Sequence, residues 1–194
     1  MAQVVVINHI SLDGVMQAPG RPDEDRRGGF EHGGWAAANS DAVMAQKMGV
    51  GSARNASILL GRRTYEDFAR VWASRTDNPY SQALDNARKY VASNTLREPL
   101  PWRNSILLAG DATDAVAELR RGDESVNVFG SGELVRSLMA RDLIDEYLLM
   151  IHPLILGSGQ RLFGDRGPFS ALRLEDSVTT TTGVVIGTYR PETN

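Results

Sequence analysis

The sequence predicts one α/β domain with a mixed, mostly parallel central sheet flanked by helices. Short apolar runs alternate with helical patterns along the 194 residues, as in domains that pack helices onto a sheet. Several of these runs are apolar at consecutive positions, which is typical of strands covered on both faces. The length suits a single compact domain, 1–194, with a full hydrophobic core.

Two groups of strands are expected. The first six are the apolar runs 4–7, 58–60, 90–92, 106–108, 126–129 and 147–151. The last two, 172–178 and 184–189, are separated only by 179–183, so they must pair antiparallel. A wholly parallel dinucleotide-binding fold does not normally end in such a hairpin, and we therefore expect a mixed sheet.

Helices are expected between these strands. Three amphipathic stripes have helical spacing, and they are Tyr65, Phe68, Ala69 and Trp72; Ala112, Ala115, Val116 and Leu119; and Leu134, Val135, Leu138 and Met139. Asp111 is suited to cap the second helix. An earlier helix is expected over 40–48, with Gly49 as its C-terminal stop.

Two loops interrupt this pattern, 17–34 and 74–80. The first is rich in glycine, proline and charge, and it is long for a compact domain. Long segments of this kind either cover a ligand or are disordered, and the sequence leaves both readings open.

Composition excludes several classes of function. The net charge of −3 gives no electrostatic case for nucleic acid. The chain has no cysteine, so disulfides and thiolate metal sites are excluded, and its three histidines are too scattered for a metal site. The N-terminus is not a signal peptide, and no run approaches the roughly 18 apolar residues of a membrane helix. We expect a cytoplasmic protein with a small-molecule partner.

The strongest local signal is the turn Gly130-Ser131-Gly132, between a strand and a helix. Glycines let a backbone approach a ligand closely, and the free N–H groups of a helix start favour an anion such as pyrophosphate. The turn also fits a simple tight connection. A standard Rossmann site is disfavoured, because Val135 stands where a third glycine is needed and the turn comes late in the chain.

A second turn, Gly61-Arg62-Arg63-Thr64, also joins a strand to a helix. Guanidinium groups and a hydroxyl at a helix start are suited to phosphate. The arginines could equally be a solvated helix start. Two such turns in one small sheet favour a dinucleotide, which carries phosphates along its span.

Further polar residues follow other strands. Ser93 and Asn94 come directly after the third strand, where open sheets bind ligands, although they also suit a turn. Asp13 precedes Gly14 and is either a turn former or a proton donor. His152 lies in an apolar run and is interpreted as a packed strand residue.

Taken in order, these motifs resemble the dihydrofolate reductase superfamily. The resemblance rests on Ser11-Leu12-Asp13-Gly14, Gly61-Arg62-Arg63-Thr64-Tyr65-Glu66 and Phe129-Gly130-Ser131-Gly132-Glu133-Leu134. Residues 142–147, 153–159 and 161–163 are similar to the branch related to the C-terminal reductase domain of the bifunctional riboflavin-biosynthesis deaminase-reductase. The likeness runs from about Val4 to Tyr189.

The resemblance implies a dihydrofolate reductase-like fold, an NADPH cofactor, no metal and a homodimer. The implied cofactor-binding residues are His9, Gly61, Arg62, Arg63, Thr64, Ser93, Asn94, Phe129, Gly130, Ser131, Gly132, Glu133 and Leu134. Asp13 is the expected proton donor or anchor, and Val15, Met16 and Trp35 the expected substrate-pocket walls; Trp35 also fits an ordinary core position.

The chain departs from its relatives at two positions. Asn94 stands where many relatives have a basic residue, which bears on the choice between NADPH and NADH. Phe129 stands where the riboflavin-pathway reductases have glutamate. Glu31 and Asp41 do not match the carboxylate of folate reductases.

The expected function is an NADPH-dependent reductase of a small heterocyclic or carbonyl substrate, of the riboflavin-pathway (5-amino-6-(5-phosphoribosylamino)uracil reductase) or dihydrofolate reductase type. Two alternatives stay open. One is a non-catalytic ligand-binding module on the same fold, because fold does not determine function. The other is a nucleotide-binding protein that uses the second turn alone.

Overall fold

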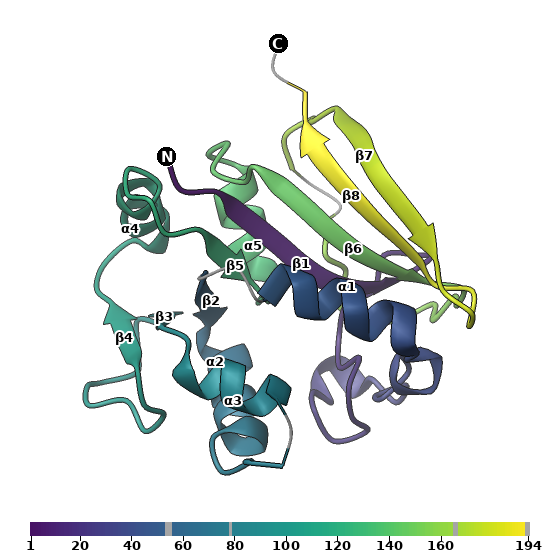
Figure 1. The fold of residues 1–194 in the computed structure, drawn as a ribbon, viewed down its shortest axis with the longest axis horizontal. Coiled ribbons are helices and arrows are strands. Elements are labelled where there is room, and N and C mark those ends of the chain that lie inside the picture. The colour runs from purple at the N-terminus through teal and green to yellow at the C-terminus, as the bar shows by residue number, and fades with distance from the viewer. Residues whose placement is uncertain (53–55, 78, 165–166, 193–194) are drawn as a thin grey trace.

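The computed structural model describes residues 1–52, 56–77, 79–164 and 167–192. Its centre is an eight-stranded sheet with the strand order β4-β3-β2-β5-β1-β6-β8-β7 (Figure 1). The strands are β1 Val4–Ser11, β2 Ser57–Gly61, β3 Lys89–Ala92, β4 Ser105–Leu108, β5 Val126–Val128, β6 Glu146–His152, β7 Leu172–Thr179 and β8 Val185–Pro191. The first six pair in parallel, whereas β8 is antiparallel to both β6 and β7. The expectation of a mixed sheet ending in a hairpin is confirmed.

Helices cover both faces of the sheet. They are α1 Ala42–Ser52, α2 Arg62–Trp72, α3 Pro79–Asn86, α4 Ala112–Leu119 and α5 Gly132–Met139, with short 3-10 turns η1 Arg27–Gly29 and η2 Ala37–Asn39. Strand β1 shows how the faces divide, because side chains alternate along a strand. Val4 and Val6 pack in the cluster that contains the apolar residues of α4 and α5, and Ile7 packs with Met44 of α1 on the other face. Helices α2 and α3 cover the same face as α1, against β2 and β3.

Two helix boundaries differ from the sequence-based expectation. Helix α1 does not stop at Gly49 but continues through Gly51 to Ser52, since each glycine inside a helix costs only about 1 kcal/mol. Residues 79 and 80 were expected in a loop, but they begin helix α3, which the sequence did not predict. The eight residues of this helix are too few to show a clear hydrophobic period. Lys89, fully buried, donates from Nζ to the carbonyl oxygens of Leu84, Asp85 and Ala87 at 2.7–3.1 Å and so completes the end of that helix.

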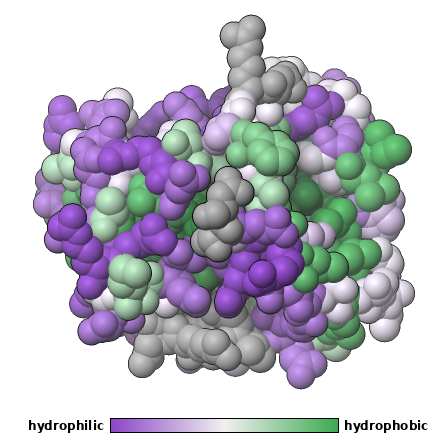
Figure 2. All heavy atoms as spheres, turned by 90° about the horizontal axis from the view of Figure 1, so that it is seen from above, coloured by the Kyte–Doolittle hydropathy of each residue, from purple (hydrophilic) through white to green (hydrophobic). Residues whose placement is uncertain are grey.

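The C-terminal hairpin of β7 and β8 carries exposed apolar side chains. Seen from above, hydrophilic residues dominate the left and centre of the surface, and hydrophobic residues gather toward the side of β7 and β8 (Figure 2). Leu174 of β7 and Val185 of β8 are 51% and 37% exposed. By contrast, the apolar run of β6 lies inside the sheet, where Tyr147, Leu149 and Met150 are buried.

The unequal lengths of neighbouring strands leave an opening in the sheet. Strand β5 pairs with β1 only from Val4↔Val126 to Val6↔Val128, whereas β1 continues to Ser11 beside β6. The end of β1 therefore has a strand on one side only. Because β1, β2, β3 and β5 are parallel, their carboxyl ends meet at this edge, where ligands bind in open α/β sheets.

Candidate functional site

A cleft of about 1160 Å³ lies along these carboxyl ends. It is lined by residues 7–9, 16–21, 24–27, 48, 61–64, 66–68, 70, 72, 80, 92–95, 110–113, 129, 131–134, 136–137 and 160. Among the residues expected to bind the cofactor or substrate, this lining includes His9, Met16, Gly61, Arg62, Arg63, Thr64, Ser93, Asn94, Phe129, Ser131, Gly132, Glu133 and Leu134. Residues from segments far apart in the sequence, between Ile7 and Gln160, thus meet in one place.

The two glycine turns contact each other in the middle of the cleft. The N–H of Gly61 donates to the carbonyl oxygen of Gly130 at 2.8 Å. A Cβ added to Gly61 would lie 2.7 Å from Ser131 Oγ, and one added to Gly132 would lie 2.8 Å from Met16 Sδ. Gly130 has φ +125°, a backbone conformation that side chains rarely adopt. Close packing at Gly61 and the positive φ of Gly130 therefore favour glycine at these two positions.

Both helices that start at these turns lack a side-chain cap. The N-cap residues are Gly61 for α2 and Ser131 for α5; Gly61 has no side chain, and that of Ser131 forms no capping hydrogen bond. Helix α4, in contrast, is capped by Asp111, which accepts from the N–H of Thr113, as expected. Uncapped N–H groups and the positive end of a helix dipole attract anions. Two such ends beside one another fit a dinucleotide's pyrophosphate.

Positive side chains extend this anion-binding region. Arg62 and Arg63 both line the cleft at the start of α2. Arg62 pairs with Glu66 one turn on, at 3.1 Å. Arg63 is exposed and forms no ion pair or hydrogen bond within the described residues, so its guanidinium is free for a phosphate.

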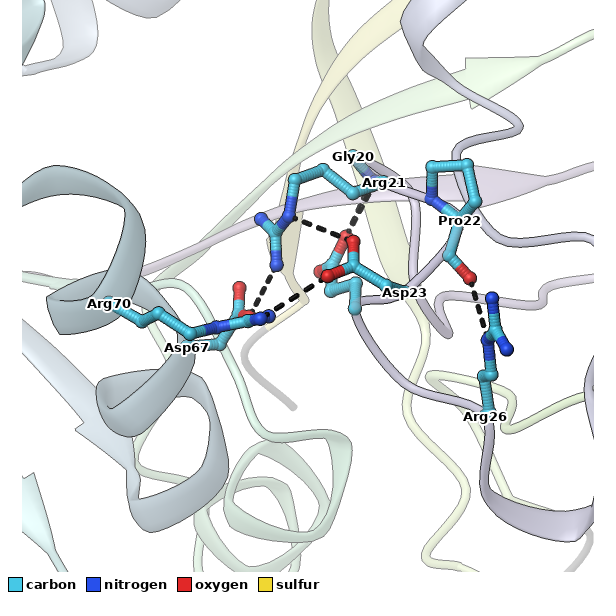
Figure 3. Close-up of polar contacts among 8 residues, drawn as sticks. Gly20, Arg21, Pro22, Asp23, Arg26, Asp67 and Arg70 are labelled. Carbon is cyan, nitrogen blue, oxygen red and sulfur yellow. Dashed lines mark hydrogen bonds and ion pairs between the residues drawn. The ribbon is translucent and has the colours of Figure 1, made fainter.

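Loop 17–34, for which the sequence left two readings open, lines the cleft through residues 17–21 and 24–27. Figure 3 shows the ion pairs that join this loop to Asp67 and Arg70 of α2. Arg21 Nη2 lies 2.5 Å from Asp67 Oδ1 of α2, and Arg70 of the same helix binds both Asp67 at 2.8 Å and Asp23 at 3.2 Å. Arg21 Nε also lies 3.4 Å from Asp23 Oδ1. We call these four residues the loop–helix ion cluster. It ties the loop to α2 across the cleft.

The opposite wall is apolar and aromatic. Phe129 lies against Phe68 of α2 with ring centroids 6.0 Å apart, and Trp72 lies edge-on to Tyr80 at 5.3 Å. Helix α1 contributes Met48 to the lining. Such a wall fits a flat heterocyclic ring, and α1 presents no carboxylate to the cleft.

Two histidines connect the cleft to the interior. His9 Nδ1 lies 2.9 Å from Nε2 of His152, which is fully buried at the end of β6 as the sequence predicted. His152 Nδ1 lies 3.3 Å from Asn39 Nδ2. Burial lowers the pKa of His152 to about 4, and burial together with repulsion from His152 lowers the pKa of His9 to about 4. Both rings are neutral at pH 7.

Asp13, the expected proton donor, lies outside the cleft lining and holds a loop instead. Its carboxylate accepts from Ser11 Oγ at 2.6 Å and from the N–H groups of Leu156 and Gly157 at 3.1 and 2.9 Å. These bonds, led by that of Ser11, lower the pKa of Asp13 to about 2. The carboxylate stays ionised and is fully engaged, so the geometry favours a turn-forming role for Asp13 over the role of proton donor.

Three other expected site residues also lie outside the lining. Val15 is fully buried in a cluster with Phe30. Trp35 donates from Nε1 to the carbonyl oxygen of Gln17 at 2.7 Å and packs edge-on against His152. Gly130 contributes backbone to the glycine turn. Val15 and Trp35 thus support the cleft from behind and do not form its walls.

Sequence reasoning missed several residues that line the cleft. Phe68 and Trp72 were assigned to a helix stripe facing the core, and the turn Gly110-Asp111 was used only as a helix cap. The position of that turn after a strand was the available signal. Nothing local marked Met48 or Tyr80, because their helices reach the cleft only through packing.

Fold and site together define a reductase-type domain of the dihydrofolate reductase-like class. The chain belongs to the RibD C-terminal domain family, whose profile matches residues 2–186. It is 26% identical over 134 residues to YyaP, an uncharacterised protein of Bacillus subtilis (strain 168), a match covering 66% of this chain and 70% of that protein.

Solved structures share this fold. A protein named for riboflavin biosynthesis from Shewanella sp. PV-4 is 24% identical, with a TM-score of 0.73 and full coverage of both chains. Dihydrofolate reductase from Enterococcus faecalis, complexed with NADP(H), is 13% identical, with a TM-score of 0.63 over 98% of this chain and 97% of that one. At such identities the likeness shows the fold alone.

None of the described helices combines the length and apolar character needed to cross a bilayer. In the same part of the chain, no three His, Asp or Glu side chains are grouped so that they could hold a metal ion.

Proposed function

We propose that the protein is an NADPH-dependent reductase of a small heterocyclic or carbonyl compound. The observation that carries this proposal is the contact between the glycine turns of β2 and β5, which places two uncapped helix N-termini at the centre of one cleft. The NADP(H) complex of the structurally similar folate reductase supports the choice of cofactor. When bound, the cofactor supplies the hydride, and the protein supplies orientation and water exclusion.

The described residues divide the cleft between cofactor and substrate. Gly61 to Thr64 and Ser131 to Leu134 would hold the pyrophosphate, and Ser93 and Asn94 the adenosine side. We propose that the free guanidinium of Arg63 pairs instead with the 2′-phosphate, for which Asn94 supplies no charge, and that it thereby favours NADPH over NADH. The aromatic wall at Phe129 would accept a flat substrate ring.

Gly130→Val tests the cofactor assignment. A branched side chain at φ +125°, with Thr64 Oγ1 only 3.2 Å from the new Cβ, should force the turn open. We expect wild-type protein to bind NADPH with micromolar affinity, seen as quenching of tryptophan emission, and the variant to bind at least about 100-fold more weakly. Gly167→Val, an exposed glycine away from the cleft, is the control. Absence of wild-type binding at millimolar NADPH would rule the function out.

A non-catalytic binding module is the second candidate. The position of Asp13 outside the cleft and the apolar face of α1 favour it, because neither supplies an obvious acid. Oxidation of NADPH by pterin, pyrimidine or quinone acceptors would exclude this candidate, provided that Gly130→Val abolishes the reaction.

A homodimer is also proposed. The exposed apolar residues of β7 and β8 support it, since exposed apolar patches often mark interfaces. Light scattering should give twice the 21.2 kDa chain mass; a monomer at micromolar concentration would contradict the proposal.

A further inference from the structure

His9 stands at the boundary between the cleft and the buried face of the sheet. It lines the cleft two residues beyond Ile7, so both side chains lie on the face covered by α1. Its Nδ1 is engaged by His152 at 2.9 Å. Its second ring nitrogen, Nε2, has no partner within the residues that the structure describes. One nitrogen of this ring therefore remains available to a ligand.

The hydrogen bonds behind His9 have a direction. The amide nitrogen of Asn39 can only donate, so Nδ1 of His152 is the acceptor at 3.3 Å. A neutral imidazole carries one proton, and that of His152 must then be on Nε2, from which it is donated to His9 Nδ1. His9 in turn carries its own proton on Nε2.

Packing and a further hydrogen bond hold Asn39 and His152 in place. The backbone oxygen of Asn39 accepts from Thr182 Oγ1 at 2.7 Å, which ties η2 to the turn before β8. Trp35 packs edge-on against His152 with ring centroids 5.1 Å apart. The low pKa of both histidines keeps them neutral at pH 7, so each ring has only one proton to place.

We infer that His9 donates a hydrogen bond from Nε2 to the reacting oxygen or nitrogen of a C=O or C=N acceptor, and that His152 and Asn39 hold it in this donor form. The inference rests on the proposed reductase function. It narrows the substrate class to acceptors with a heteroatom at the reacting double bond. His9 is then a catalytic residue, and His152 and Asn39 are positioning residues.

The chemistry balances without a charged histidine. The acceptor carbon gains the hydride while the π electrons of the double bond move to its oxygen or nitrogen, and the nicotinamide is oxidised in the same step. Negative charge therefore grows on the atom that faces His9 Nε2–H. A neutral imidazole can stabilise such charge by a hydrogen bond, and the product heteroatom takes its proton from solvent water.

The protonated nitrogen can be observed without substrate or cofactor. The chain has three histidines, so protein labelled with ¹⁵N-histidine gives three pairs of ring-nitrogen signals, and His32→Gln assigns the exposed one. At pH 8 we expect His9 to be protonated on Nε2 and bare on Nδ1. The opposite tautomer would overturn the inference.

Asn39→Asp should reverse the direction of the hydrogen bonds from residue 39 through His152 to His9. The new carboxylate can only accept, so His152 must place its proton on Nδ1, and His9 must donate from Nδ1 and turn a bare Nε2 to the cleft. We expect the ¹⁵N chemical shifts of His9 Nδ1 and Nε2 to swap. The rate of NADPH oxidation by menadione or 7,8-dihydropterin should fall about 100-fold at pH 8, and the Kd for NADPH should stay within about twofold of wild type. Asn86→Asp, on the surface beside Arg103, controls for the added charge.

Two variants keep the test valid if Asn39→Asp does not fold. Glutamine at position 9 can place an N–H near that of Nε2, and leucine cannot. His9→Gln should retain at least about a tenth of the rate, and His9→Leu should lose about 100-fold, while the two variants bind NADPH equally well. Equal rates for the two variants would overturn the inference, as would NADPH binding with neither probe reduced. Failure to bind NADPH at all would instead contradict the proposed function.

Discussion

Single residues without a side chain shape the centre of the cleft. At Gly61 and Gly132 any Cβ would lie within 2.8 Å of a neighbouring atom, and Gly130 has a backbone conformation open mainly to glycine. Arg63 and the two uncapped helix starts surround this point. The region therefore concentrates positive charge where backbone can come closest to a ligand.

Asp13 provides a prediction about a single carboxylate. Asp13→Asn keeps one acceptor oxygen but loses the charge that two N–H groups and Ser11 Oγ share, so the free energy of unfolding should fall by about 1–2 kcal/mol. Urea unfolding measures this change, and Asp123→Asn, on an exposed loop, should change it little. NADPH affinity should stay the same. Lost turnover with unchanged stability would restore Asp13 as the proton donor.

The paired histidines predict acid sensitivity. Both have a pKa of about 4 in the folded chain against 6.5 for an ordinary histidine, so between these values the unfolded chain binds more protons. Their contribution is complete above pH 6.5 and is lost as the pH falls toward 4, on the order of 3 kcal/mol for each histidine. Unfolding at pH 7 and pH 4.5 measures it. The difference should shrink in the double variant His9→Gln with His152→Gln and persist in His32→Gln; an equal difference in both would contradict the assignment.

Among the elements, loop 17–34 depends on α2 for its position. The loop–helix ion cluster joins them, and Glu24 accepts from the N–H groups of Gly20 and Arg21 at 2.7 and 3.1 Å. Burial raises the pKa of Glu24. The loop is thus held by its ion pairs to α2 and by the hydrogen bonds that the Glu24 carboxylate accepts within the loop. These contacts explain how a polar segment forms one wall of the cleft.

Asp67→Asn should loosen this wall. The change removes the charge that Arg21 and Arg70 share, so trypsin should cleave after Arg26 or Arg27 several times faster, and the Kd for NADPH should rise about three- to tenfold. Glu124→Gln breaks a surface pair with Arg88 away from the cleft and serves as the control. Unchanged cleavage in Asp67→Asn would show that the ion cluster does not hold the loop.

At the scale of the whole molecule, one sheet connects every part of the cleft. Strands β1, β2, β3 and β5 end at the same edge, and β6 and β8 carry the face on which His152 and α1 pack. A ligand that spans this edge contacts segments from residue 7 to residue 160. Ligand binding should therefore stabilise the folded chain as a unit.

NADPH should raise the thermal midpoint of unfolding. At a concentration 100 times its Kd, a ligand that binds only the folded form adds about 2.7 kcal/mol, which for a chain of this size corresponds to about 5–10 °C. Differential scanning calorimetry measures the shift, and Gly130→Val should abolish it. A shift of equal size with ATP would favour the reading of a simple nucleotide-binding protein.

Local patterns were sufficient to predict the sheet, its final hairpin, the helices α2, α4 and α5 and both glycine turns, because strand and helix periods and turn chemistry depend on neighbouring residues. The ordered motifs also indicated the family. Helix α3 was missed because Lys89 and buried Leu84, rather than a strong period, stabilise it. The bond between His9 and His152 joins residues 143 positions apart, and Asp13 bonds to Gly157 across 144. Only tertiary packing could decide these contacts, since no local rule relates residues so distant in the chain; it placed Asp13 outside the cleft lining and joined His9 of that lining to the buried His152.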